Sequence, residues 1–265
     1  MIHEIGHTDD PRLAPYRHVA DPAWLRAQGL FVAEGRLVVE RLIESGHAIE
    51  SLLLTPAARD ALGGALLERC PVYVAPPSVV NSLTGVNFHR GCLAIARRFP
   101  ARDLDAFAHA ERLVILEGVG NPDNVGGIFR SAAALGAGGI LLGPGTGDPL
   151  YRKAIRTSMG AALRVPFAAV APWPDALARV RAIGFRIAAL SPIGALTIEQ
   201  FASTVTAGAR IALMAGAEGP GLSGAALSAA DETVRIPVDA RSDSLNVVVA
   251  VSIALERLCR FRPVE

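Results

Sequence analysis

The sequence has few of the features that mark membrane-spanning, secreted or disulfide-bonded proteins. No apolar run reaches the ~20 residues needed to cross a bilayer, although 51% of the chain is hydrophobic. The first residues, MIHEIGHTDDPRLAPYR, have neither the apolar stretch nor the small-residue cleavage site of a secretory signal. Cys70, Cys92 and Cys259 form no CxxC pair and are odd in number, which argues against a disulfide framework or a cysteine metal site. We therefore expect a soluble cytoplasmic protein with no membrane contact and no bound metal.

Lysine is almost absent from the chain. Lys153 is the only lysine among 26 basic residues, and a codon bias toward arginine explains this better than phosphate binding does. The formal net charge of +1 gives no global argument for a nucleic-acid partner. Arginines therefore indicate RNA binding only where they gather in a site.

Apolar strands alternate with helices along the chain, which predicts an α/β fold. We expect a small α/β domain at residues 1–99, a charged linker at 100–111 and a second α/β domain at 112–265. In the first domain, residues 1–29 are expected to be irregular apart from a short helix near 21–28. The strands and helices expected there are strands 31–33, 49–54, 72–74 and 91–96 and helices 35–46, 56–69 and 77–83.

The second domain repeats βα units, which indicates a mostly parallel sheet covered by helices on both faces. The elements expected there are strands 112–117, 139–142, 164–170, 185–190, 210–215 and 233–238, and helices 124–135, 149–162, 174–183, one after Ser223, and 244–260. Ligands of open α/β sheets bind beyond the carboxyl ends of the strands. Four glycine- or proline-marked loops follow strands here, at 118–124, 143–147, 216–221 and 237–246.

The first of these loops leads from a strand into a small-residue helix through Asn121-Pro-Asp-Asn124. Asparagine and aspartate are good helix N-caps, and a helix entered in this way presents backbone donors and a partial positive charge. Arg130 follows Asn124 by six residues, nearly two helical turns further on. By itself, this pattern fits either a ligand site or a capped helix with an outward arginine.

The second and third loops differ in what they offer a ligand. The loop Gly143-Pro-Gly-Thr-Gly147 lacks the GxGxxG spacing of dinucleotide sites, which favours a plain tight turn. Glu218 lies in the loop Ala215-Gly-Ala-Glu-Gly-Pro-Gly221 with no other charge nearby, so its carboxylate must accept hydrogen bonds. It either caps the neighbouring backbone or orients a ligand or an arginine.

The fourth loop leads into the last helix. Ser242, Asp243 or Ser244 can cap that helix, which leaves the amide of Asn246 in the first turn free of a capping role. An amide there can both donate to a ligand and accept from it.

Three motifs in these loops together resemble the SpoU (TrmH-type) RNA ribose 2′-O-methyltransferases of the SPOUT superfamily. The motifs are Asn124-x-Gly126-x-x-x-Arg130-Ser-Ala, Gly216-x-Glu218-Gly-x-Gly221, and Ile236-Pro237 with Ser244-Leu-Asn-Val247. They occur in the family's order and at its spacing. GRLVVERLIESG and HRGCLAIARR also resemble the small, ribosomal-protein-like RNA-binding domain that precedes many SpoU catalytic domains. The chain has Val238, Ala240 and Val248 where the family often has methionine, glycine and serine.

The resemblance implies a C-terminal trefoil knot, a homodimer packed partly through the last helix, and S-adenosylmethionine as cofactor. The cofactor contacts that it implies are Leu142, Gly143, Gly216, Ile236, Leu245 and Asn246. It places Arg130 at the ribose 2′-hydroxyl and RNA phosphate, and we expect Asn124, Glu218, Ser244 and Asn246 to orient Arg130, the ribose and the cofactor. The basic residues that we expect to contact RNA are Arg90, Arg97, Arg98, Arg152, Lys153 and Arg156.

The function predicted on this basis is 2′-O-ribose methylation of RNA, with the N-terminal domain favouring 23S ribosomal RNA. A transfer RNA methyltransferase, and an enzyme of self-resistance acting on ribosomal RNA, remain open alternatives. A non-catalytic RNA-binding or ribosome-assembly protein on the same fold would not bind the cofactor. Another α/β nucleotide enzyme, such as a dehydrogenase, would bind NAD, against which the missing dinucleotide motif argues.

Overall fold

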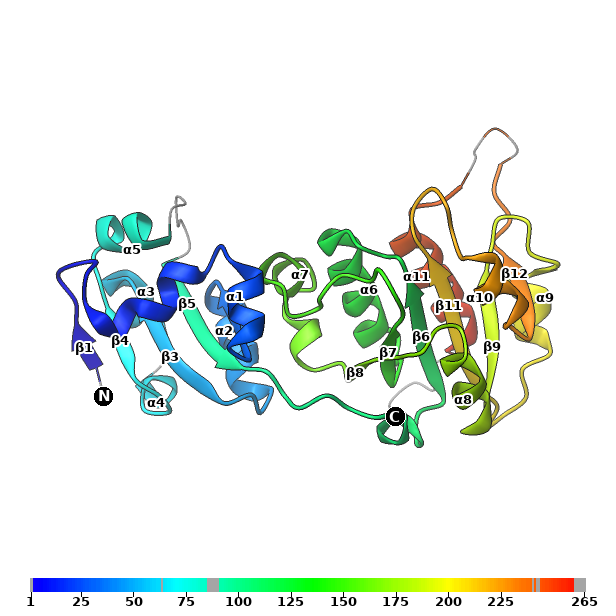
Figure 1. The fold of residues 1–265 in the computed structure, drawn as a ribbon, viewed down its shortest axis with the longest axis horizontal. Helices are drawn as coiled ribbons and strands as arrows, with labels where there is room; N and C mark the ends of the chain where they lie inside the picture. Colours follow the sequence, from blue (N-terminus) through cyan, green and yellow to red (C-terminus); the bar gives the residue numbers. More distant parts are fainter. Residues whose placement is uncertain (1, 63, 85–90, 240, 242–243, 260–265) are drawn as a thin grey trace. The chain divides into compact units, whose positions relative to one another are not determined.

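A computed structural model describes residues 2–62, 64–84, 91–239, 241 and 244–259 of the chain (Figure 1). Its contacts divide the chain into two compact units. The first unit comprises Met1–Pro100 and Leu150–Leu163, and the second comprises Ala101–Pro149 and Arg164–Glu265. The segment Leu150–Leu163 thus groups with the first unit, although the sequence places it in the second predicted domain.

A mixed five-stranded sheet forms the centre of the first unit. In spatial order its strands are β1 (Ile2–Glu4), β4 (Val72–Val74), β3 (Ile49–Leu54), β5 (Cys92–Arg97) and β2 (Leu30–Glu34). The strands β1, β4 and β3 are parallel, whereas β5 runs antiparallel to both of its neighbours. The four strands expected from the sequence are present, and β1 is an additional one.

Short helices accompany this sheet. They are η1 (Pro11–His18), α1 (Pro22–Ala27), α2 (Arg36–Glu44), α3 (Pro56–Ala61), α4 (Gly64–Leu67), α5 (Pro77–Thr84), α7 (Arg152–Thr157) and η3 (Ala161–Leu163). Two predicted helices are shorter than expected. The helix at 56–69 is divided into α3 and α4, and that at 149–162 ends at Thr157, after which Met159 and Gly160 adopt positive φ.

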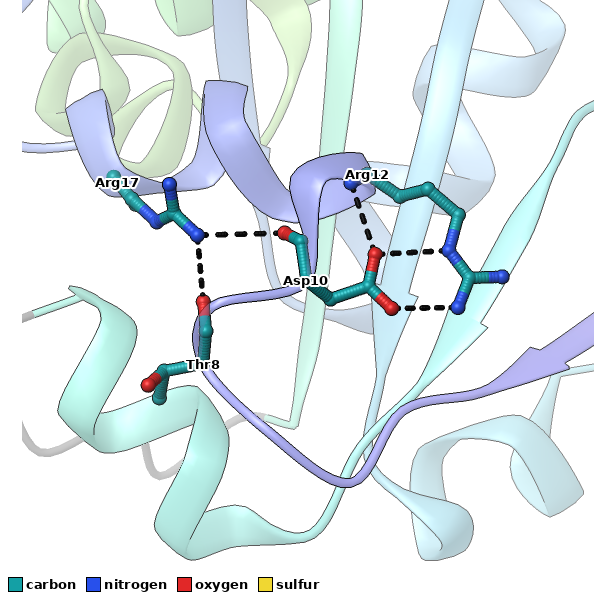
Figure 2. A network of polar contacts seen from close by, with 4 residues as sticks. All are labelled: Thr8, Asp10, Arg12 and Arg17. Carbon is teal, nitrogen blue, oxygen red and sulfur yellow. Dashed lines mark hydrogen bonds and ion pairs between the residues drawn. The ribbon is translucent and has the colours of Figure 1, made fainter.

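The segment before α1, expected to be irregular, is held by polar contacts around Asp10 (Figure 2). Asp10 caps η1, and its Oδ1 accepts hydrogen bonds from the backbone N and the Nε of Arg12, both at 2.9 Å. Arg17 Nη2 donates to the carbonyl of Thr8 at 2.8 Å. The hydrogen bonds from the Arg12 side chain lower the pKa of Asp10 from 3.8 to about 2.

The second unit is built on a parallel seven-stranded sheet. In spatial order its strands are β10 (Leu196–Thr197), β12 (Glu232–Arg235), β9 (Phe185–Leu190), β11 (Arg210–Gly216), β6 (Arg112–Glu117), β7 (Gly139–Leu142) and β8 (Phe167–Ala169). Every pairing in this sheet is parallel, as the βα alternation predicts. The carboxyl ends of these strands therefore meet at one edge of the sheet.

Helices and buried side chains cover both faces of this sheet. The helices are η2 (Leu104–Phe107), α6 (Pro122–Ala134), α8 (Ala176–Ala182), α9 (Ile198–Ser203), α10 (Gly224–Ser228) and α11 (Val247–Leu258). Leu113 and Ile115 of β6 lie in one core cluster with residues of η2, α8 and α10. The intervening Val114 is also fully buried, so β6 is covered on both sides.

Two stretches that look polar in the sequence contain packed structure. Leu104 and Phe107 of the predicted linker lie in the core of the second unit, 4% and 1% exposed. The segment between β9 and β11 contains β10 and α9, and Ile198 and Phe201 of α9 are fully buried. A few apolar residues at helical spacing are enough to dock a short helix.

Candidate functional site

The helices α6 and α11 pack closely because Gly127 has no side chain. A Cβ at Gly127 would lie 2.9 Å from both methyl groups of Val248, closer than real Cβ atoms come. One helical turn further on, Ser252 Oγ donates to Ser131 Oγ at 2.7 Å. This close packing brings the N-terminal turns of the two helices, and the side chains of Asn124 and Asn246, together.

Asn246 is itself the N-cap of α11, so its expected position inside the first turn is wrong. The helix begins at Val247 rather than at Ser244, and Asn246 Oδ1 accepts a hydrogen bond from the backbone N of Val248 at 2.9 Å. The other proposed caps, Ser242 and Asp243, lie outside the described residues. Capping uses only the side-chain oxygen, so the Nδ2 group of Asn246 still points to other partners.

Asn246 joins two other predicted site residues into what we call the polar cluster: Asn124, Glu218 and Asn246. Its Nδ2 donates to Glu218 Oε1 at 2.6 Å and to Asn124 Oδ1 at 3.3 Å. Asn124 is only 7% exposed, whereas Glu218 and Asn246 are open to solvent. The structure thus brings together one residue from each of the three sequence motifs, and confirms that the Glu218 carboxylate accepts a hydrogen bond.

A cavity of about 710 Å³ lies beside this cluster, within the size range of small-molecule sites. Its walls are the segments after β9, β11 and β12 and the start of α11, all at the carboxyl edge of the sheet. Among the lining residues that the structure describes, Glu218 is the only charged one. The predicted site residues that line it are Gly216, Glu218, Ile236, Ser244, Leu245 and Asn246.

The glycine loop after β11 folds back on itself to form one wall of the cavity. A Cβ at Gly216 would lie 2.2 Å from the backbone carbon of Gly221, and Ala217 pairs with Gly221 in an isolated bridge. Only glycine permits that approach, and it leaves backbone groups at the cavity surface.

Leu142 and Gly143, expected to contact a cofactor, do not line this cavity. The backbone of Gly143 donates to the carbonyl of Leu116 at 2.7 Å, and Gly118 donates to the carbonyl of Pro144 at 2.8 Å. The loop after β7 is therefore a tight turn packed against the loop after β6, as its missing GxGxxG spacing predicts.

Arg130 lies on α6, apart from the polar cluster. Six residues rotate a helix by roughly 240° from Asn124, so the two side chains leave different faces. Arg130 is exposed and makes no hydrogen bond or ion pair within the described part of the chain. The structure therefore does not join Arg130 to Asn124, Glu218 and Asn246 by direct contacts.

One wall of the cavity was not foreseen from the sequence. The turn Ser191-Pro-Ile-Gly194 follows β9, and Gly194 N donates to the carbonyl of Ser191 at 3.0 Å. Ile193 at its tip lines the cavity and is 92% exposed, an unusual position for a large apolar side chain. The signal was a proline–glycine turn at the carboxyl end of a buried strand.

The predicted RNA-contacting residues that the structure describes lie in the first unit, several of them in contacts of their own. Arg97 pairs with Glu50, and Arg98 Nε donates to the carbonyl of Leu30 at 3.1 Å. Arg152 Nη1 lies 3.3 Å from Glu34 Oε2. Lys153 and Arg156 lie on α7 with Arg152, and Arg90 lies outside the described residues.

The described residues contain neither a cluster of metal ligands nor a membrane-spanning helix. No group of three or more His, Cys, Asp or Glu side chains there could hold a metal ion. No helix of that part of the chain is both long and apolar enough to cross a membrane.

Comparisons with known proteins agree with the three motifs. The model of the SpoU rRNA Methylase family matches residues 111–256. The chain is 39% identical to an uncharacterised tRNA/rRNA methyltransferase of Mycobacterium bovis, over 96% of this chain and 90% of that protein. The AdoMet-bound rRNA methyltransferase from Sinorhizobium meliloti is 26% identical with a TM-score of 0.84, over 97% of both chains. A solved RNA 2′-O ribose methyltransferase is 25% identical with a TM-score of 0.77, over 97% of this chain and 98% of that one.

Proposed function

Since the chain belongs to the SpoU rRNA methylase family, and is an RNA methyltransferase by that membership, we propose that it methylates ribose 2′-hydroxyl groups. Its substrate in this proposal is ribosomal RNA of the large subunit, and its cofactor is S-adenosylmethionine. The observation that carries the proposal is the polar cluster at the edge of the cavity, where one residue of each motif meets the others.

The cavity suits S-adenosylmethionine in size and chemistry. Its apolar side chains, among them Leu190, Ile236 and Leu245, offer surface to an adenine ring, and the glycine loop offers backbone hydrogen-bonding groups. Glu218 lines the cavity with one negative charge, which would complement the positive charge on the sulfur of this cofactor. The related AdoMet-bound structure supports this cofactor.

When bound, the cofactor would supply a methyl group on a positively charged sulfur. A hydroxyl oxygen can attack the carbon of that methyl group and displace the sulfur, which leaves as a neutral thioether. Such a displacement requires the oxygen, carbon and sulfur to be nearly collinear, so orientation is the main contribution of the protein. Asn246 is well placed for orientation, because α11 fixes its oxygen and Glu218 fixes its nitrogen. Arg130 is proposed to hold the ribose hydroxyl and RNA phosphate, since a guanidinium is a poor base but a good phosphate ligand.

A homodimer would reconcile the position of Arg130 with this role. Arg130 leaves a different face of α6 from Asn124, so we propose that Arg130 of the partner subunit serves each cavity. Val249, which is 45% exposed on α11, provides apolar surface for such an interface. Mixing the strongly impaired variants Arg130→Ala and Asn246→Asp should then restore part of the activity, because one of the two cavities in a mixed dimer keeps both groups. No recovery in mixed dimers would place Arg130 in its own subunit's site.

We propose that residues 1–99 bind RNA, that 100–111 connect them to the methyltransferase domain at 112–265, and that the C-terminal segment forms the family's trefoil knot. Cytoplasmic localisation is proposed with them. The extra unit before the family match favours a large, structured substrate such as ribosomal RNA.

The deciding experiment is transfer of labelled methyl from S-adenosylmethionine into total RNA, separated into ribosomal and transfer RNA. Label in the ribosomal fraction, lost in Arg130→Ala while cofactor binding is retained, is the expected result. Label in transfer RNA would show that the substrate is transfer RNA rather than ribosomal RNA, and the proposed reaction would stand. Retained activity in Arg130→Ala would exclude its role, and absence of cofactor binding would favour a non-catalytic RNA-binding protein.

A further inference from the structure

A second carboxylate, Glu117, lies at the carboxyl end of β6 and is only 8% exposed. Its Oε1 accepts hydrogen bonds from Trp173 Nε1 at 2.6 Å and from Ser223 Oγ at 2.7 Å. Its Oε2 accepts a third from the backbone N of Ser223 at 2.8 Å. All three partners are donors, which is the arrangement that suits an ionised carboxylate.

Ser223 connects Glu117 to the wall of the cavity. It directly follows Leu222, which lines the cavity at the end of the glycine loop. Its Oγ also accepts from the backbone N of Ala226 at 3.1 Å and so caps α10. In the sheet, Glu117 is the register partner of Gly216, where the same loop begins. Glu117 is therefore next to both ends of the glycine loop.

Trp173 connects Glu117 to the turn after β7. A Cβ at Gly143 would lie 3.2 Å from Trp173 Cζ3, so the indole ring packs against the backbone of Gly143. The hydrogen bond to Glu117 fixes the ring in that position. The buried carboxylate of Glu117 thus contacts both Ser223, which follows the glycine loop, and Trp173, which packs on the Gly143 turn.

We propose that Glu117 is a positioning residue for the cofactor: it acts through Ser223 on the glycine loop, while Trp173, packed on the Gly143 turn, holds the Glu117 carboxylate in place. The inference rests on the proposed use of S-adenosylmethionine in this cavity. Glu117 does not line the cavity itself, so it acts on the shape of the site rather than on the reacting atoms.

Glu117→Gln tests this directly, because the amide has nearly the same shape but replaces one acceptor by a donor. Its single oxygen cannot accept from all three partners, so an N–H group must face another donor. The expected result is a rise of about tenfold in the Kd and KM for S-adenosylmethionine, with kcat at saturating cofactor nearly unchanged. A merely structural defect would lower kcat by reducing the active fraction and leave KM unaffected.

Trp173→Phe is the second variant, which removes one hydrogen bond and keeps the remaining two. We expect a smaller rise in the Kd for S-adenosylmethionine, of about threefold. The double variant Glu117→Gln with Trp173→Phe should have the same Kd as Glu117→Gln alone, because both changes act on one network. If Glu117→Gln does not fold, Trp173→Phe decides the question. Glu232→Gln is the matched control: it makes the same chemical change in a half-exposed ion pair with Arg186 in the same unit, and should leave Kd unchanged.

Fluorescence gives a readout independent of activity. The chain has two tryptophans, so in a Trp24→Phe background the emission comes from Trp173 alone. Glu117→Gln should shift that emission, and Glu232→Gln should not. Wild-type cofactor affinity in both Glu117→Gln and Trp173→Phe would overturn the inference and leave the proposed function standing. A wild-type chain that does not bind S-adenosylmethionine would overturn both.

Discussion

Both units are built from helices and a sheet, but the directions of their strands differ. The polar side chains of the two units also differ in what they do. In the second unit all strands are parallel, so the segments after β9, β11 and β12 meet at one edge and enclose a cavity. In the first unit β5 runs against both of its neighbours, so its carboxyl end lies at the opposite edge of the sheet from those of the other four strands. Charged groups there are engaged in holding segments together, as in Asp10 with Arg12 and Glu34 with Arg152. The parallel sheet places the loops after several strands at one edge, where they can form a site. In the unit with the mixed sheet, these charged side chains stabilise the structure.

Asn246→Asp should have the largest effect and would test the second-unit side of this comparison. The variant keeps the oxygen that caps α11 but loses the donor to Glu218 and Asn124, and it sets a carboxylate against Glu218. We expect methyl transfer to fall about 100-fold through lost orientation, with little change in the unfolding temperature.

The matched variant Asn246→Ala separates orientation from capping. It removes the cap as well, which should cost about 1 kcal/mol of stability. Near-normal transfer by Asn246→Asp in the presence of saturating cofactor would show that the polar cluster serves the fold alone.

Glu34→Gln should have a smaller effect, confined to the stability of the first unit. Glu34 is 9% exposed, and its Oε2 faces Arg152 without accepting a hydrogen bond, so the ion pair is held by charge. Removing the charge leaves Arg152 half-buried without its counter-ion and should cost about 2 kcal/mol. Urea unfolding measures this loss, and cofactor affinity should not change.

Glu40→Gln is the control for that measurement. Its pair with Arg36 lies on the surface of α2 at 3.6 Å, and exposed pairs contribute little. Equal losses in the two variants would contradict the distinction between the buried and the exposed pair.

Asp10→Asn should have the smallest effect, and one that depends on pH. The pKa of Asp10 is lowered to about 2 in the folded chain, so its stabilising contribution is fully present above its usual value of 3.8 and is lost as pH falls through about 2. The difference in urea midpoint between wild type and Asp10→Asn should therefore shrink between about pH 5 and pH 2. A difference that is constant with pH would assign the effect to packing of η1 rather than to the charge.

Buried strands were the part of the fold that the sequence predicted best. The strands β6, β7 and β9 match the predicted ranges residue for residue, because continuous apolar runs between glycines and turns have few alternatives. Polar stretches were predicted poorly. Phe107 and Phe201 are single aromatic residues in charged surroundings, and tertiary contacts rather than local pattern decide that they are buried.

The sequence predicted which residues belong to the site better than it predicted how they are arranged. The motif spacing named Asn124, Glu218 and Asn246, which the structure joins by hydrogen bonds. The capping role of Asn246 was missed because several good caps precede it, and the choice among them depends on where α6 meets α11. Glu117 and Trp173 were missed because 56 residues separate the two, and no local pattern marks a pairing over that distance.

The membership of Leu150–Leu163 in the first unit limits how the chain can be dissected. A single cut near residue 100 would release a C-terminal fragment that keeps this segment but loses the strand β2 and the residue Glu34 against which it is anchored. Ala154, Ile155 and Leu163, all nearly or fully buried in the intact chain, would then be uncovered. Such a fragment should aggregate unless the segment is shortened. Exchange of whole units between relatives should work only when Leu150–Leu163 is exchanged together with residues 1–100.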